Sequence, residues 1–169
     1  RRRQPPRFIQ ARHEEMAAFE AVGYAKFSGK VGVCAATSGP GAIHLLNGLY
    51  DAKLDHVPVV AIVGQTNRSA MGGSYQQEVD LLSLYKDVAS DFVEMVTVPE
   101  QLPNVLDRAM RTAMARRTVC AVIIPRRRAG TGLLAARARL QDGPPLQPGH
   151  AALRAGARRR GPLPRREAR

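Results

Sequence analysis

The stretch that decides the fold is VGVCAATSGPGAIHLLNGLYDAKLDHVPVVAIVG, residues 31–64. It contains two apolar, β-rich runs, 31–37 and 57–64. The first run leads into a glycine turn, SGPG, and apolar residues then recur at helical spacing up to Leu54. A nearly all-apolar strand such as 57–64 is typical of a sheet that is covered on both faces. We therefore interpret residues 31–64 as one βαβ unit of a parallel sheet.

The same alternation continues on both sides of this unit. Met16, Phe19 and Phe27 recur at helical spacing in one segment, and a longer apolar stripe begins at Leu102 in another. The pattern predicts strands at 7–11, 92–98 and 119–125, helices at 13–28, 40–54, 79–86 and 99–116, and a loop at 65–77. Residues 7–125 are thus predicted to form an α/β domain, with a parallel sheet flanked by helices.

Residues 126–169 have a different composition. They hold 12 Arg against two acidic residues, whereas residues 1–125 hold 14 Lys and Arg against 12 Asp and Glu. The segment contains no Ile, Val, Phe or Tyr, so it cannot bury enough apolar surface to offset the entropy of ordering, and we predict that it is disordered. Arg, Ala, Gly and Pro dominate it, and all four have GC-rich codons, which is typical of an out-of-frame reading of GC-rich DNA.

Several other classes of protein are excluded or disfavoured. No apolar run approaches the roughly 20 residues of a membrane span, and the first residues do not resemble a signal peptide, so we expect a cytoplasmic protein. Cys34 and Cys120 provide neither a disulfide framework nor a zinc pattern. Nucleic acid is a disfavoured partner, because the Arg-rich segment has no aromatic residue that could stack on a base.

Two motifs fail on a single residue each. The turn Gly39-Pro40-Gly41 begins like a dinucleotide fingerprint, but His44 stands where the third glycine belongs. The sequence HEEMA begins like a zinc-binding HExxH motif, but its last position is Ala17, so we expect no metal site. Spacing alone also gives Glu14 a structural role, since an acid in the first turn of a helix is stabilised by the amide groups there. A histidine on a helix, such as His44, is also more often structural than functional when it is judged from the sequence alone.

Four motifs stand in a fixed order: RHEEMA at 12–17, ATSGPGA at 36–42, HLLNGLYDA at 44–52 and DHVPVVAI at 55–62. Together they resemble the N-terminal pyrimidine-binding (PYR) domain of thiamine-diphosphate-dependent enzymes. The variant with His44 is most similar to pyruvate oxidases and the quinone-linked pyruvate dehydrogenase, within a wider group that includes acetolactate synthases. The resemblance covers about residues 7–125. It implies the thiamine-diphosphate-binding fold of PYR type, without the strand and helix with which relatives begin.

The resemblance also implies a site. The glutamate that matches Glu14 bonds N1′ of the cofactor's aminopyrimidine ring and so activates the cofactor for attack on a 2-oxo acid. An apolar cleft would raise the pKa of this carboxyl and a helix N-terminus would lower it, and the sequence leaves that balance open. Gln77 matches the glutamine near the substrate, although Gln76 replaces the usual aromatic residue, with Tyr75 just before it. The residues expected beside the pyrimidine are Ser38, Gly39, Pro40, Gly41 and His44.

The resemblance finally implies partners that this chain does not contain. In the family, magnesium and the diphosphate are bound by a separate PP domain with a GDG motif, the active site forms between the PYR domain of one subunit and the PP domain of another, and some members bind FAD. No GDG occurs in this sequence. We therefore expect a fragment of a homo-oligomeric, 2-oxo acid decarboxylating enzyme that is inactive alone. The alternative is a short scaffold whose Arg-rich segment binds nucleic acid or an acidic partner.

Overall fold

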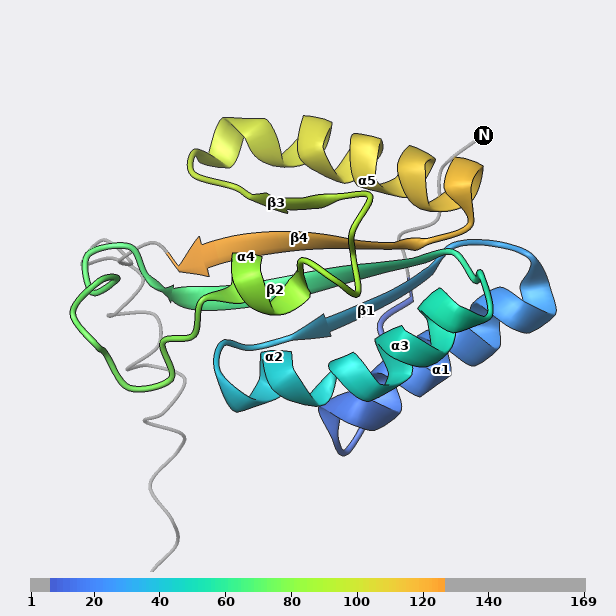
Figure 1. Cartoon of the computed structure of the whole chain (residues 1–169), viewed down its shortest axis with the longest axis horizontal. Coiled ribbons are helices and arrows are strands. Elements are labelled where there is room, and N and C mark those ends of the chain that lie inside the picture. Colours follow the sequence, from blue (N-terminus) through green and yellow to red (C-terminus); the bar gives the residue numbers. More distant parts are fainter. Residues whose placement is uncertain (1–6, 127–169) are drawn as a thin grey trace, which may run out of the picture. The chain divides into compact units, whose positions relative to one another are not determined.

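The computed structural model describes residues 7–126, which form a single four-stranded parallel sheet between helices (Figure 1). The strands lie in the order β1-β2-β4-β3. The predicted α/β fold with a parallel sheet is therefore confirmed. In chain order the elements are α1 (Glu14–Ser28), β1 (Gly32–Ala36), α2 (Pro40–His44), α3 (Leu46–Leu54), β2 (Val59–Asn67), α4 (Leu81–Tyr85), β3 (Val93–Met95), the 3-10 helix η1 (Pro99–Gln101), α5 (Leu102–Arg116) and β4 (Val119–Arg126).

Helices cover both faces of the sheet. Figure 1 shows α5 on one side and α1, α2 and α3 on the other. Successive residues of the central strands alternate between these two layers: Val59 and Ala61 of β2 pack into the core beneath α1 and α3, whereas Val60 packs into the core beneath α5. In β4, Ala121 and Val122 divide in the same way. This double coverage is why both strands are apolar at almost every position, as the sequence predicted for 57–64.

The buried side of α1 consists of three alanines and Val22. Ala18, Ala21 and Ala25 are buried, whereas the larger side chains expected to mark the apolar face are exposed, with Phe27 at 96%. The close approach of α3 explains this arrangement, since a Cβ added at Gly48 would lie only 2.6 Å from the Cβ of Ala18. Large side chains do not fit between helices packed so closely, and they are left on the outer face.

One predicted strand is absent. Residues 7–11 have no regular secondary structure, and Phe8 is 83% exposed. A strand is stable only when its backbone groups pair with a neighbour and one face of it is buried. The local β propensity of RFIQA meets neither condition among residues 7–126, so the prediction of a strand here was wrong.

Two further boundaries differ from the predicted ones. The helix expected at 40–54 is interrupted at Leu45, which separates α2 from α3. The Tyr85 hydroxyl donates a hydrogen bond to the Ala42 carbonyl at 2.6 Å, and thus gives a carbonyl of α2 a partner outside the helix. The strand β2 continues to Asn67, into the predicted loop, because it pairs with β4 as far as Arg126.

Arg126 is therefore the last residue of β4 and does not belong to the Arg-rich segment to which we assigned it. The predicted disorder of that segment concerns residues 127–169, which lie outside the described part of the chain. Within residues 7–126, no helix has the length and apolar character needed to cross a membrane.

Candidate functional site

The candidate site lies at the carboxyl ends of the strands. Helix α1 leads directly into β1 and packs against it, so the first turn of α1 lies beside the end of β1. Glu14 is the first residue of α1, and Gly41 lies in the first turn of α2, the short helix that follows β1. A Cβ added at Gly41 would lie 3.3 Å from Oε1 of Glu14. Two residues that are 27 positions apart in the sequence are thus brought together.

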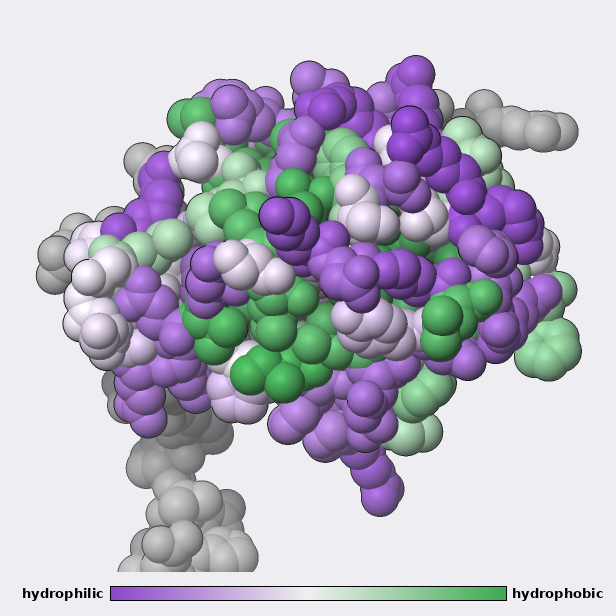
Figure 2. Space-filling view, viewed as in Figure 1, coloured by the Kyte–Doolittle hydropathy of each residue, from purple (hydrophilic) through white to green (hydrophobic). Residues whose placement is uncertain are grey.

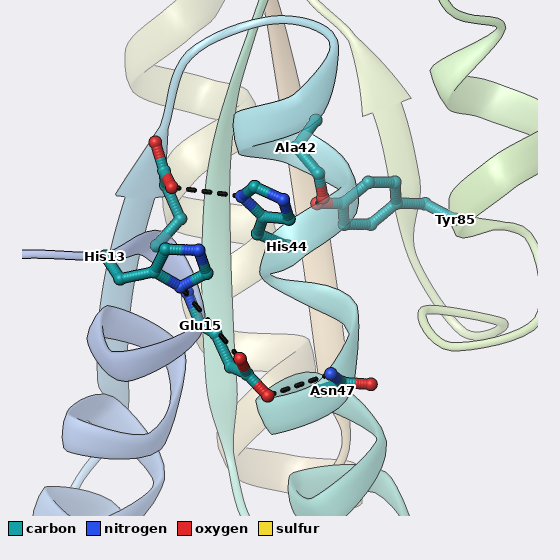
Figure 3. A network of polar contacts seen from close by, with 7 residues as sticks. His13, Glu15, Ala42, His44, Asn47 and Tyr85 are labelled. Carbon is teal, nitrogen blue, oxygen red and sulfur yellow. Dashed lines mark hydrogen bonds and ion pairs between the residues drawn. The ribbon is translucent and has the colours of Figure 1, made fainter. Parts of the chain in front are cut away.

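Glu14 contacts a histidine from the next helix. Its Oε2 lies 3.2 Å from Nδ1 of His44, the last residue of α2. The ring of His13 stacks on the ring of His44, with 4.5 Å between centroids and an interplanar angle of 29°. Figure 3 shows the two rings side by side, with a dashed line marking the bond that His44 makes. Both expected residues, Glu14 and His44, therefore belong to one cluster.

The Glu14 carboxylate is partly exposed to solvent and also makes hydrogen bonds with polar groups of the protein. Its side chain is 35% exposed. The backbone N–H of Glu14 itself at the start of the helix, and then the hydrogen bond with His44, hold the pKa of this carboxyl below its ordinary value. The balance that the sequence left open is thus decided by the groups that favour the charged form, and Glu14 is ionised near neutral pH.

A second polar pair fixes α1 against α3. Oε1 of Glu15 accepts a hydrogen bond from Nδ2 of Asn47 at 2.8 Å, and the backbone N–H of Glu15 donates to Nδ1 of His13 at 3.3 Å (Figure 3). His13 is the N-cap of α1. Sequence reasoning gave Glu15 and Asn47 no role, although Asn47 lies within the HLLNGLYDA motif. No spacing rule connects residues 32 positions apart, so only the motif could have drawn attention to them.

The glycine turn is shaped by a close approach of the chain to itself. Gly39 has a φ of 66°, and a Cβ there would lie 2.7 Å from the Cβ of Gln77. A side chain at position 39 would therefore both strain the backbone and collide with Gln77. Pro40 is the first residue of α2, where its fixed φ suits the helix start, and Ser38 lies in the turn before it. The structure thus places Gln77 directly against the turn.

The loop that carries Gln77 is held by the neighbouring acid. The Glu78 carboxylate accepts hydrogen bonds from the backbone N–H groups of Gly72 at 2.5 Å and of Tyr75 at 3.0 Å. Gln77 itself has a φ of 66°, which is unusual for a residue with a side chain. Tyr75 and Gln76 are both exposed on this loop. The residues expected near the substrate therefore lie on a solvent-facing loop packed on the glycine turn.

These residues are chemically suited to one half of a cofactor site. The missing side chain at Gly41 lets the Glu14 carboxylate lie against the backbone, and this carboxylate can accept a hydrogen bond or share a proton. The ligand atoms of His13, Glu14 and His44 also lie within 4.8 Å of one another, a spacing close to that of metal ligands.

Comparison with known proteins identifies the family. A family model described as "Thiamine pyrophosphate enzyme, N-terminal TPP binding domain" matches residues 1–84. The pyruvate oxidase of Lactiplantibacillus plantarum is 47% identical over 118 residues, which are 70% of this chain and 19% of that protein. The acetolactate synthase isozyme 2 large subunit of Escherichia coli is 46% identical over 109 residues, which are 64% of this chain and 20% of that protein.

An acetolactate synthase of Arthrospira platensis is similar to the same degree, at 47% identity over 106 residues, or 63% of this chain and 18% of that protein. The chain thus spans about a fifth of the length of the curated relatives it matches. Thiamine pyrophosphate is the same compound as thiamine diphosphate, so the expected resemblance is confirmed, both in the motifs and in the fold that carries them. The chain belongs to the family of N-terminal TPP binding domains of thiamine pyrophosphate enzymes.

Proposed function

We propose that residues 7–126 supply the aminopyrimidine half of a thiamine diphosphate site in a pyruvate oxidase-like enzyme that decarboxylates a 2-oxo acid. The observation that carries this proposal is the position of Glu14. Its carboxylate lies at the carboxyl ends of the strands, next to the backbone of Gly41, in a chain whose family binds this cofactor. When bound, thiamine diphosphate supplies a thiazolium ring that accepts electrons as the 2-oxo acid loses carbon dioxide.

In this proposal Glu14 bonds N1′ of the aminopyrimidine ring. The turn Ser38, Gly39, Pro40 and Gly41 lies beside the ring, His44 orients the Glu14 carboxylate, and Gln77 faces the substrate. Sharing a proton with a ring nitrogen requires a carboxyl whose pKa is closer to neutral than that of an acid bonded to a helix N-terminus. A partner domain that covers Glu14 and excludes water would raise its pKa in this direction.

The rest of the site belongs to other parts of the proposed enzyme. The sequence has no GDG motif, so we assign magnesium and diphosphate binding to a PP domain of a partner subunit within a homo-oligomer. FAD, where it is used, also binds outside the described domain. Apolar side chains gather over α2 and α4 on the face shown in Figure 2, and Ile43 and Leu82 of these helices are exposed. Such a surface next to Glu14 suits contact with a covering domain.

The choice of pyruvate oxidase over acetolactate synthase rests on the HLLNGLYDA variant. The identities of 47% over 118 residues and 46% over 109 residues do not separate the two. The scaffold alternative depends on the Arg-rich segment, of which residues 127–169 lie outside the described part of the chain, and no contact of the described domain favours it.

The test is a Glu14→Gln substitution in a complete enzyme. Residues 7–126 are placed in the Lactiplantibacillus plantarum pyruvate oxidase in place of the segment they match. We expect Glu14→Gln to lower kcat by about 100-fold or more, because an amide cannot share the required proton, while the Kd for thiamine diphosphate changes little. Glu20→Gln, at another exposed acid of α1, is the matched control and should leave kcat unchanged. Near-normal turnover in the Glu14→Gln chimera would refute the role.

The isolated chain provides a second measurement. Calorimetric titration with thiamine diphosphate and magnesium should give no saturable binding in the micromolar range, because the groups proposed to hold the diphosphate are not in this sequence. Micromolar affinity would show that the chain binds the cofactor without a PP domain, and the proposed division of the site would then be wrong.

A further inference from the structure

The cluster at the start of α1 has the composition of a metal site. His13 and Glu14 come from the N-terminus of α1, and His44 comes from the end of α2. One ligand atom from each of the three residues lies within 4.8 Å of the other two. Figure 3 shows the His13 and His44 rings next to each other, and the two rings are stacked. We propose that these three side chains bind a transition-metal ion, with Zn²⁺ as the representative, when thiamine diphosphate is not bound. This site shares Glu14 with the proposed cofactor site and is distinct from the magnesium site of the cofactor.

The donor set decides which ions fit. Two imidazole nitrogens and one carboxylate oxygen are suitable for Zn²⁺, Co²⁺ or Ni²⁺, whereas Mg²⁺ prefers oxygen ligands and keeps most of its water. Three protein ligands leave at least one position for water, which is typical of an open site rather than a closed structural one. The site should therefore discriminate against the magnesium ion that accompanies thiamine diphosphate.

The stacked rings of His13 and His44 have to separate before both can ligate one ion, because an imidazole nitrogen binds a metal in the plane of its ring. Ligand atoms about 2.1 Å from a tetrahedral Zn²⁺ are roughly 3.4 Å apart, and Oε2 of Glu14 already lies 3.2 Å from Nδ1 of His44. The His13 ring has to move towards Glu14 and His44. Its side chain is 47% exposed, so it can change rotamer. The Glu14–His44 half of the proposed site is thus formed before the ion binds, and His13 completes the site by leaving its stacked position.

The backbone behind His44 is fixed. The Tyr85 hydroxyl, on a fully buried side chain, donates to the carbonyl of Ala42, two residues before His44 (Figure 3). On the other side, Glu15 holds the start of α1 to α3 through Asn47. These two contacts hold the segments that carry the ligands, which lowers the entropy cost of binding an ion.

Ligation has one local cost. Nδ1 of His13 accepts a hydrogen bond from the Glu15 N–H at 3.3 Å, so in the neutral ring the proton is on Nε2. Binding the ion through Nε2 moves that proton to Nδ1 and breaks the capping bond. Because this bond is long, the loss is small, and the affinity should be micromolar rather than that of a buried structural zinc site.

The sequence could not show this site. The HExxH motif places its two histidines on one helix, four residues apart, and that pattern fails here at Ala17. The second histidine of the proposed site comes instead from a different helix, 31 positions after His13. The sequence-based expectation of no metal site addressed only local spacing.

The test is calorimetric titration of the full chain with Zn²⁺ alone, without thiamine diphosphate, so its result does not depend on the proposed function. We expect about one equivalent to bind in the micromolar range, and no saturable binding of Mg²⁺ at the same concentrations. Glu14→Gln and His44→Ala should each weaken Zn²⁺ binding by at least about tenfold. His13→Asn should do the same while keeping the helix cap, since Asn is a good N-cap residue, and circular dichroism checks that the fold is retained.

The remaining histidines provide the controls. His56→Ala, at the opposite ends of the strands, and His150→Ala, outside the described residues, should both bind Zn²⁺ like the unsubstituted chain. Unchanged Zn²⁺ affinity in Glu14→Gln and His44→Ala would overturn the site, and so would loss of binding in either control. Binding of Mg²⁺ with comparable affinity would overturn the assigned ion class.

Discussion

At the scale of single residues, Glu14 has neighbours that favour its charged form. The helix N-terminus and His44 both lower the pKa of its carboxyl. A carboxyl with a lowered folded-state pKa contributes to stability above its unfolded pKa, and this contribution is lost as the pH falls through the folded pKa. Proton sharing, which the proposed function requires, therefore depends on a change in the surroundings of Glu14 rather than on the domain alone.

His44 is the neighbour that can be removed without disturbing the helix start. His44→Ala should raise the pKa of Glu14 towards its ordinary value, because one of the two main groups that favour the carboxylate is lost while the backbone contribution remains. Carbon NMR of the glutamate carboxyl groups, followed through an acid titration, measures this shift. His56→Ala is the control. A Glu14 pKa that is unchanged or lower in His44→Ala would contradict the contribution assigned to the His44 bond.

At the scale of elements, close approach between α1 and α3 determines which side chains are buried. Gly48 of α3 faces the backbone of α1, where an added Cβ would lie 2.6 Å from the Cβ of Ala18 and 2.9 Å from the backbone nitrogen of Phe19. Backbone atoms cannot move aside as a flexible side chain can. The alanine-rich face of α1 and Gly48 of α3 thus allow the two helices to pack closely. This packing also holds Glu14 next to α2.

Two glycines in helices allow a matched comparison. Gly48→Ala should lower the free energy of unfolding by about 1–2 kcal/mol, because the added methyl forces the helices apart. Gly23→Ala, in the middle of α1 with no atom within 4 Å of the added Cβ, should raise it by about 0.5–1 kcal/mol through helix propensity. Urea denaturation measures both. Stabilisation by Gly48→Ala would show that the helices are not in close contact.

At the scale of the whole molecule, the domain leaves large apolar side chains on its surface. Phe27 of α1 and Leu54 of α3 are exposed, in addition to Ile43 and Leu82 near the candidate site. A contiguous exposed apolar surface marks a place where another protein surface binds, or a tendency to associate. The sequence resembles one domain of a larger enzyme. Exposed apolar side chains are consistent with this resemblance, because other domains of such an enzyme would cover them.

Self-association of the chain should therefore depend on these side chains. The double substitution Phe27→Ser and Leu54→Ser should weaken self-association at least about tenfold, which corresponds to 1.4 kcal/mol, while stability changes little because both side chains are exposed. Sedimentation velocity over a range of concentrations measures the effect, with Glu20→Ser as the control. If the double variant associates like the unsubstituted chain, the association is driven by another surface.

Local signals predicted most of the elements. The apolar runs at 31–37, 57–64 and 119–125 correspond to β1, β2 and β4, and the helical spacing after Leu102 corresponds to α5. These predictions hold because burial on both faces leaves a pattern in the sequence itself. Residues 7–11 show the limit of this reasoning, since strand propensity does not provide a strand with a pairing partner.

The sequence by itself determined most of the strands and helices along the chain, the glycine turn, and the motifs that identify the family, because each depends on residues close together in the chain. Only the tertiary structure decided which face of α1 is buried, that His44 adds to the lowering of the Glu14 pKa, and that His13, Glu14 and His44 form one cluster. Such properties depend on distances between residues about 30 positions apart. Those distances are determined by the packing of α1 and α2 at the ends of a parallel sheet, and no local spacing rule contains them.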